Sequence, residues 1–106
     1  MDESRFHRLA DQVLEQLADQ LDDVLGDRLD VELDHGILTL TLPSRAQYVI
    51  NKHGPMRQIW MSSPVSGASH YGHQQDDVWV STRDEANQLR RTVLAEISAA
   101  FGISLT

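Results

Sequence analysis

Residues 29–42 read LDVELDHGILTLTL and contain two runs in which apolar and polar side chains alternate. In the first run, three apolar residues alternate with three acidic residues. The pair His35-Gly36 then precedes the second run, residues 37–42. Period-2 alternation is typical of a half-buried β-strand, and a pair such as His35-Gly36 is typical of a tight turn. The stretch therefore predicts an antiparallel hairpin with one face in the core.

Further strand patterns follow this hairpin. They cover Gln47–Lys52, Arg57–Ser62, His70–Gln74 and Val78–Ser81. The triplet His53-Gly54-Pro55 predicts the turn between the first two, and residues 75–77 predict the turn between the last two. Gly72 makes the strand at 70–74 the least regular of these, and residues 64–69 are predicted to form a loop. The chain therefore predicts five to six short antiparallel strands.

An amphipathic helix is predicted at the N-terminus. From Glu3 to Leu25, apolar residues recur at spacings of three and four, which is the period of one helix face. Asp2 or Ser4 can cap the start of this helix. Gly26 stands where helices commonly end.

A second amphipathic helix is predicted before Gly102. Its apolar stripe runs from Ala86 to Phe101, and Thr82 with Glu85 has the spacing of a capping box at its start. The order of helix, strands and helix predicts an α+β two-layer sandwich with both helices on one face of the sheet. A chain of this length has the size of one domain, so we expect residues 1–106 to form a single domain. The other sheet face must then meet solvent or a partner.

Composition excludes several classes of protein. The formal net charge is −7, and an isoelectric point near 5.0 argues against nucleic acid or an anionic membrane surface as the main partner. The absence of cysteine excludes disulfides, zinc–thiolate sites and thiol nucleophiles. A mean hydropathy of −0.36 without a long apolar run excludes a transmembrane helix. Because the N-terminus has neither a signal-peptide nor a transit-peptide pattern, we expect a cytoplasmic protein.

The acidic excess lies in the first third of the chain. Residues 1–35 contain eleven acidic and three basic residues, net −8, whereas residues 36–106 contain five acidic and six basic residues, net +1. On the predicted first helix, four carboxylates fall within an arc of about 80°, where like charges repel. Three more share one face of the following strand. We call the whole set the acidic ridge: Asp11, Glu15, Asp19, Asp22, Asp23, Asp27, Asp30, Glu32 and Asp34.

The acidic ridge has two functional interpretations and one structural interpretation. Oxygen-only clusters attract hard cations such as Fe³⁺, Ca²⁺, Mg²⁺ and Mn²⁺, and they bind Fe²⁺ weakly. The same carboxylates can dock a basic protein surface. The structural alternative is a solvated face that aids solubility, but the lack of interleaved lysines favours a site. His7 precedes Asp11 by four residues and can share an ion at the edge of the ridge, or form an ordinary surface contact.

Trp60 is the candidate anchor for a partner on the open face of the sheet. In residues 57–62, two apolar residues alternate with Gln58, Trp60 and Ser62. If the apolar set faces the helices, Trp60 is exposed beside Gln58 and Asn51. An exposed tryptophan among amides is typical of an interface. The alternative register makes Trp60 a core residue, whereas Trp79 between two valines is predicted to lie in the core.

The segment Tyr48–Gly67, YVINKHGPMRQIWMSSPVSG, resembles the signature block of the frataxin family. The shared elements are Asn51-Lys52, Gln58-Ile59-Trp60 and Ser63-Pro64 through Gly67. The opening Phe6-His7-Arg8-Leu9-Ala10-Asp11 is similar to the start of the bacterial CyaY branch of that family. His53 and Gly54 depart from the signature, which more often has Gln and a small polar residue there.

The resemblance implies the frataxin sandwich and a role in iron–sulfur cluster assembly. It implies that the acidic ridge binds iron, Fe²⁺ or Fe³⁺, weakly through carboxylates, with no tightly held cofactor. It also implies docking on the cysteine desulfurase and the iron–sulfur scaffold protein, with Asn51, Gln58 and Trp60 as the sheet contact set. We expect a non-enzymatic monomer that can oligomerise with iron, in the cytoplasm of a bacterium, or in the mitochondrial matrix for a processed or organelle-encoded form.

Two other function classes stay open at the level of sequence. A ferroxidase or iron store would hold Fe²⁺ at carboxylates that converge between helices. Such centres use Glu-x-x-His pairs, and neither predicted helix has one. An acidic module that binds a protein without a metal would dock by charge and would not depend on Trp60.

Overall fold

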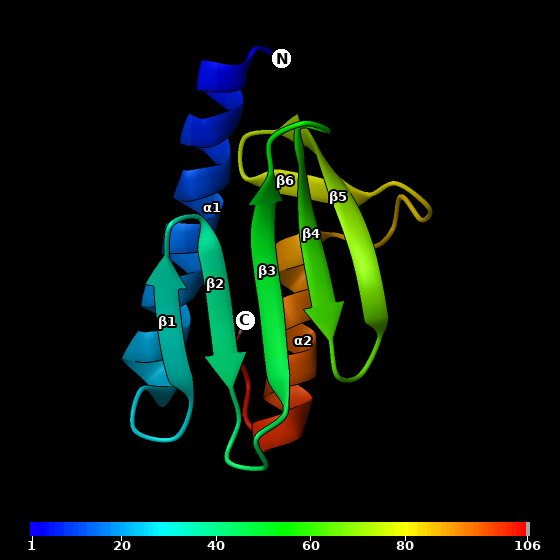
Figure 1. Ribbon diagram of the computed structural model, residues 1–106. Coiled ribbons are helices and arrows are strands. Elements are labelled where there is room, and N and C mark those ends of the chain that lie inside the picture. Colours follow the sequence, from blue (N-terminus) through cyan, green and yellow to red (C-terminus); the bar gives the residue numbers. More distant parts are fainter. Residues whose placement is uncertain (106) are drawn as a thin grey trace.

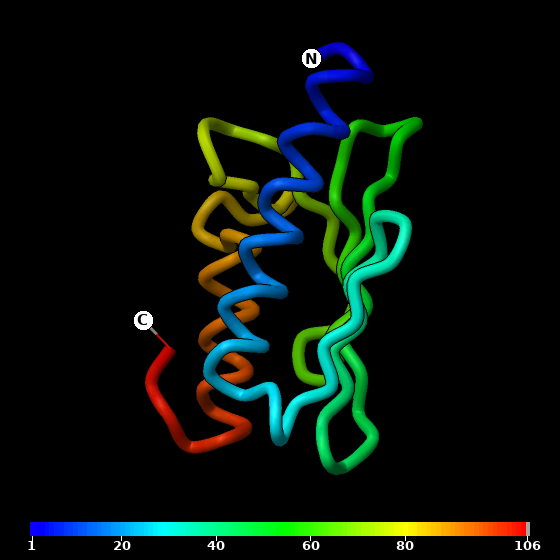
Figure 2. The backbone as a smooth tube through the Cα atoms, turned by 90° about the vertical axis from the view of Figure 1, so that its left-hand side faces the viewer, coloured from blue at the N-terminus to red at the C-terminus, as the bar shows by residue number. Residues whose placement is uncertain are grey.

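Two helices cover one face of a six-stranded antiparallel sheet in the computed structural model, which describes residues 1–105 (Figure 1). The elements are α1 (Glu3–Leu25), β1 (Asp30–Asp34), β2 (Ile37–Thr41), β3 (Gln47–His53), β4 (Gln58–Ser63), β5 (Gly67–Gln75), β6 (Val78–Ser81) and α2 (Leu89–Phe101). The strands follow one another across the sheet in chain order, as a meander. Figure 2 shows the helix layer beside the sheet, which confirms the predicted sandwich. Thr106, the last residue of the expected domain 1–106, lies outside the described residues.

Burial confirms the amphipathic patterns of the sequence. Asp2 caps α1 by accepting a hydrogen bond from the Arg5 N–H at 2.7 Å. The apolar face of α1 is buried in one core with side chains from β2 to β6 and from α2, and Val31 of β1 packs against this core. The Trp79 ring of β6 lies edge-on to the Phe6 ring, with 6.0 Å between the ring centroids. The fully buried side chains include Phe6, Val13, Leu14, Leu17, Leu21, Leu38, Leu40, Tyr48, Ile50, Ile59, Tyr71, Leu89, Val93 and Ile97. No helix within the described residues is both long and apolar enough to cross a membrane.

The predicted start of the second helix is wrong. α2 begins at Leu89, and residues 82–88 form an irregular connection in place of a capping box at Thr82 and Glu85. The Asp84 carboxylate accepts a hydrogen bond from the Ala86 N–H at 3.0 Å, which holds a local turn that competes with helix. The Asn87 carbonyl then accepts from the Ser81 N–H at 2.8 Å. The backbone therefore returns to β6 before α2 begins.

The strand β5 is longer than predicted. It begins at Gly67, within the segment predicted as a loop, and pairs with β4 from Ser63↔Gly67 to Gln58↔Gly72. The true turn is residues 64–66, and the Gly67 φ of 81° lies in the left-handed region that glycine tolerates. Because the turn is short, β5 begins three residues earlier than predicted, and His70 lies opposite Trp60.

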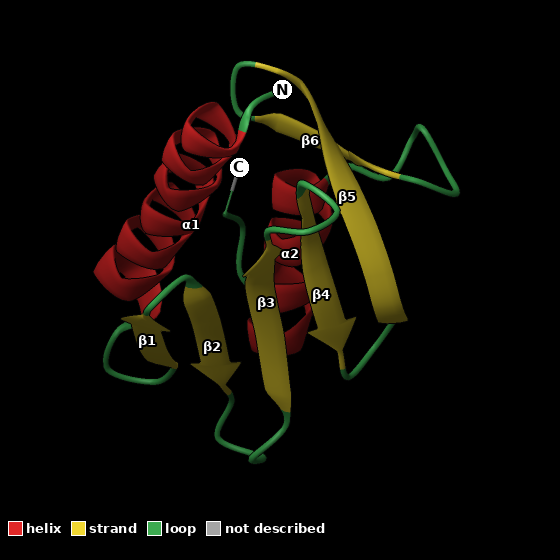
Figure 3. Cartoon of the chain, turned by 45° about the horizontal axis from the view of Figure 1, so that its top comes forward, coloured by secondary structure: helices red, strands yellow, loops and turns green. Residues whose placement is uncertain are grey.

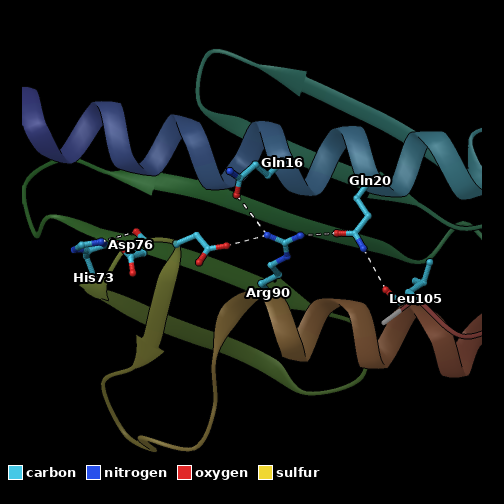
Figure 4. A network of polar contacts seen from close by, with 7 residues as sticks. Gln16, Gln20, His73, Asp76, Arg90 and Leu105 are labelled. Carbon is cyan, nitrogen blue, oxygen red and sulfur yellow. Dashed lines mark hydrogen bonds and ion pairs between the residues drawn. The ribbon is translucent and has the colours of Figure 1, made fainter.

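Arg90 joins the two helices and the C-terminal segment (Figure 4). Its guanidinium donates to Asp77 Oδ2 at 2.9 Å and to Gln20 Oε1 at 3.0 Å. Gln20 in turn donates to the Leu105 carbonyl at 3.1 Å, and the Leu105 side chain is buried. The C-terminal segment therefore packs back on the core.

Glu96 of α2 joins the helix to the sheet. Its Oε1 accepts hydrogen bonds from the Tyr48 hydroxyl at 2.9 Å and from the Ser63 hydroxyl at 2.6 Å. Ser63 Oγ also accepts from the N–H groups of Val65 and Ser66, both at 3.0 Å. Burial, with the hydrogen bond to Glu96 and the charge of its carboxylate, raises the pKa of Tyr48 to about 12.

We expect stability to fall as pH rises from about 10 to about 12, because the Tyr48 phenol ionises first in the unfolded chain. Below pH 10 the phenol is protonated in both states, so this contribution is fully present there. Urea unfolding at about pH 9 and about pH 11.5 should show a loss of about 2 kcal/mol that Tyr48→Phe removes. An equal loss in wild type and Tyr48→Phe would contradict the assignment.

Candidate functional site

The acidic ridge is divided into two rows by the edge strand β1. β1 lies beside α1 (Figure 3), with Val31 and Leu33 opposite the buried Leu40 and Leu38 of β2. These two apolar side chains therefore face the helix layer, and period-2 alternation places Asp30, Glu32 and Asp34 on the open face. We call Asp30, Glu32 and Asp34 the strand row of the ridge and its other six carboxylates the helix row. The two rows lie on either side of β1.

A groove separates the helix row from the apolar side of β1. Its volume is about 320 Å³, and it is lined by Glu15, Ala18, Asp19, Asp22, Val31 and Leu33. The carboxylates form one wall of this groove, while the two β1 side chains supply apolar surface. The structure therefore brings three of the predicted helix carboxylates together beside an apolar strip.

Asp11 is already paired within the chain. Its Oδ1 lies 2.8 Å from Lys52 Nζ, and the Lys52 side chain is only 18% exposed. Lys52 shares the helix-facing side of β3 with Tyr48 and Ile50, which brings its side chain under α1. Gly36 has a φ of 78°, and a Cβ there would approach Lys52 Cε to 2.5 Å, so the β1–β2 turn needs glycine. Sequence reasoning missed this pair, although the alternation of β3 was the signal that could have found it.

His7 contacts Glu3 and not its predicted metal partner, Asp11. Its Nε2 lies 3.7 Å from Glu3 Oε1, and Arg57 Nη2 lies 4.0 Å from Glu3 Oε2. At the other end of the ridge, Asp34 Oδ1 lies 2.6 Å from the exposed His35 Nδ1. Three of the ten predicted metal residues, His7, Asp11 and Asp34, thus have charged or titratable partners within the chain.

The other seven predicted ligands are free carboxylates. Glu15, Asp19, Asp22, Asp23, Asp27, Asp30 and Glu32 are exposed, and their side chains form no ion pair or hydrogen bond within residues 1–105. Arg90 lines one groove together with Asp19 and Asp22. Its guanidinium, however, already donates hydrogen bonds to Asp77 and to two glutamines. Across the described part of the chain, no three His, Asp or Glu side chains converge on one point as a metal-ion cage. The ridge is a surface of separate carboxylates.

Trp60 lies on the open face of the sheet between two histidine rings, and we call this set the aromatic stack. The centroid of the indole lies 3.6 Å from that of His53, with 7° between the planes, and 4.2 Å from that of His70, with 9° between the planes. Trp60 Nε1 donates to Gln58 Oε1 at 2.9 Å. The alternation of β4 had placed Trp60 outside the core correctly, but the indole is half-buried because both of its faces are covered.

The sheet register joins the aromatic stack to the strand row of the ridge. Asp34 pairs with Ile37, Ile37 with Asn51, Asn51 with Trp60, and Trp60 with His70. Directly opposed residues share one face, so these five form a row across the open face. Ile37, between Asp34 and Asn51 in this row, is 45% exposed. A partner that covers the open face therefore meets acidic, apolar and aromatic side chains at once.

Comparison with known families gives one match across nearly the whole chain. The family model described as "Frataxin-like domain" matches residues 1–103. The chain is 39% identical over 106 residues to the mitochondrial frataxin homolog of Schizosaccharomyces pombe, covering 95% of this chain and 64% of that protein. It is 43% identical over 91 residues to the mitochondrial frataxin of Arabidopsis thaliana, covering 81% and 49%. The chain thus spans about half to two-thirds of the length of these relatives.

Solved structures share the fold. A frataxin from Psychromonas ingrahamii, described within the CyaY protein family, superposes with a TM-score of 0.82 at 24% identity and covers 100% of this chain and 99% of its own. The trimeric frataxin of Saccharomyces cerevisiae complexed with ferrous ion superposes with a TM-score of 0.76 at 38% identity, covering 87% and 84%.

We expect Asp11→Asn to destabilise the chain by about 1 kcal/mol, because it leaves the partly buried Lys52 ammonium without its counter-charge. Glu15→Gln removes the same charge from the next turn of α1, where the carboxylate has no partner, and should leave stability unchanged or slightly higher. Urea unfolding at neutral pH measures both. Equal effects of the two substitutions would contradict the pairing.

Proposed function

The chain belongs to the frataxin-like family, and on that premise we propose that it is a non-enzymatic, iron-binding protein of iron–sulfur cluster assembly. The observation that carries the proposal is the row of unpaired carboxylates on α1 next to an apolar strip of β1. Like charges at helical spacing reduce stability, and no cation within residues 1–105 forms an ion pair with these particular carboxylates. Such an arrangement favours an external cation or a basic surface.

Iron is proposed to bind weakly at the helix row of the ridge. Glu15, Asp19, Asp22 and Asp23 offer oxygen ligands of the type that Fe³⁺ prefers and that Fe²⁺ accepts. Separate monodentate carboxylates leave most of the coordination sphere to water, so affinity is low and exchange is fast. At Asp11, by contrast, an ion must displace the Lys52 ammonium. We therefore place iron toward the C-terminal half of α1.

Partner docking is proposed to use both sides of β1. The ridge fits a basic surface on a cysteine desulfurase, since charge complementarity guides the encounter and fixes orientation. The open face, with Asn51, Gln58 and Trp60, fits the iron–sulfur scaffold protein. The chain is proposed to act as a monomer that can oligomerise with iron. The trimeric state of the ferrous yeast frataxin is the support for this second part.

The proposed location is the cytoplasm of a bacterium, or the mitochondrial matrix. The structural similarity to a CyaY-type frataxin fits the first, and the mitochondrial relatives fit the second.

We expect the double substitution Asp19→Asn, Asp22→Asn to abolish Fe²⁺-induced broadening of nearby NMR signals and to weaken capture of the desulfurase. The matched control Asp76→Asn, Glu85→Gln makes the same charge change at exposed side chains away from the ridge and should retain both. Added salt should weaken capture as well, because exposed charges are screened within about 10 Å at 0.1 M. Loss of capture with unchanged iron broadening would favour the acidic module without a metal role. Equal losses in both variants would contradict the assignment of iron and desulfurase binding to the acidic ridge.

We expect Trp60→Ala to weaken binding to the desulfurase–scaffold complex by about 30-fold, the scale of an interface anchor. The control Val65→Ala removes an exposed apolar side chain, 72% accessible, from the β4–β5 turn and should bind normally. Isothermal titration calorimetry on both variants provides the measurement. Wild-type affinity for Trp60→Ala would support the charge-only module over the proposed function.

A further inference from the structure

A second polar site lies at the far end of the aromatic stack. It is a recess of about 270 Å³ between the β5 strand, the end of β6 and the connection to α2. We call it the donor cup, and its polar lining comprises Ser69, His70, Ser81, Thr82, Arg83, Asp84 and Asn87. None of these residues belongs to the acidic ridge or to the predicted sheet contact set.

The hydrogen-bond acceptors of the donor cup are largely used, and its donors are left over. Asn87 Oδ1 accepts from the Tyr71 hydroxyl at 3.0 Å and from the Thr92 hydroxyl at 2.6 Å, which leaves the amide NH₂ to donate. Ser81 Oγ accepts from the Arg83 N–H at 3.1 Å. The Ser81 hydroxyl is buried, and its hydrogen has no acceptor within residues 1–105. A recess with spare donors fits an anionic ligand.

The charged residues that line the donor cup are one arginine and one aspartate. The Arg83 guanidinium has no carboxylate or carbonyl partner within the described residues. Asp84 also lines the cup, but its Oδ1 accepts the Ala86 N–H in the local turn. The Asp84 carboxylate is thus engaged within the chain, whereas the Arg83 guanidinium is left to bind a ligand. His53 is separated from the cup by the Trp60 ring.

His70 links the donor cup to the aromatic stack. One face of its ring covers the Trp60 indole, and the residue also lines the cup. Its backbone carbonyl accepts from the Thr82 N–H at 2.9 Å, which fixes the wall of the cup to the connection that carries Arg83. An anion bound in the cup therefore lies next to the aromatic stack. Its binding should shift the NMR signal of the Trp60 indole N–H.

We propose that the donor cup binds a carboxylate, namely an Asp or Glu side chain or the C-terminus of a protein segment that lies on the open face. The planar fork of Arg83 matches the two oxygens and the single charge of a carboxylate. The Ser81 hydroxyl and the Asn87 amide supply neutral donors. Phosphate recognition commonly uses clusters of arginines, and the cup has one. The proposal needs neither iron nor a desulfurase.

The test is an NMR titration of the full chain with sodium acetate at constant ionic strength, with chloride as the reference and inorganic phosphate as the competing probe. We expect saturable shifts of the Trp60 indole N–H signal, assigned by its loss in Trp60→Phe.

Arg83→Gln should abolish the acetate-specific shifts, while the control Arg91→Gln removes another exposed arginine, on α2 away from the donor cup, and should retain them. Unchanged spectra of the unliganded variants, apart from local shifts, show that each one is folded. Saturable acetate binding lost only in Arg83→Gln supports the proposal. Shifts shared with chloride, shifts that persist in Arg83→Gln, or saturable binding of phosphate but not of acetate would overturn it.

Discussion

The burial of the apolar face of α1 against the sheet determines the orientation of the carboxylates on that helix. Phe6, Val13, Leu14, Leu17 and Leu21 are all fully buried, so rotation of the helix is opposed by the hydrophobic effect. The opposite face is then held toward water. Because the carboxylates of α1 lie on that opposite face, core packing offsets the repulsion that their spacing creates. The acidic surface thus depends on the apolar one.

The sheet makes a second surface by the same rule of alternation. Residues that face the helices are mainly apolar, and two polar exceptions near strand ends bond to helix carboxylates: Lys52 to Asp11 and Ser63 to Glu96. Residues on the other face meet across strands in fixed register, which sets Asp34, Asn51, Trp60 and His70 in one row. The two surfaces share the edge strand β1. One small chain can therefore contact two partners, or two parts of one assembly, on either side of that strand.

Most of the fold was predictable, whereas the details of the candidate site were less so. The limits of α1, the β1–β2 hairpin and the outward side of Trp60 all follow from local periodicity, and the structure confirms them. The predicted start of α2 was wrong because two local contacts outcompete the capping-box pattern. Asp84 accepts a hydrogen bond that holds a turn, and the Asn87 carbonyl accepts one from β6. The predicted length of β5 was wrong because Gly67 permits a three-residue turn, whereas the sequence had predicted a six-residue loop.

The sequence by itself determined which residues form helices and strands, which faces are apolar and where the negative charge is concentrated, because these properties depend on neighbours within a few residues. Tertiary structure alone decided that Lys52 neutralises Asp11, that His53 and His70 enclose Trp60, and that Arg83 and His70 line one recess. Each of these contacts joins different elements. The distance across them depends on strand register, turn length and the position of α1 over the sheet, and only the packing of the whole core fixes those quantities together.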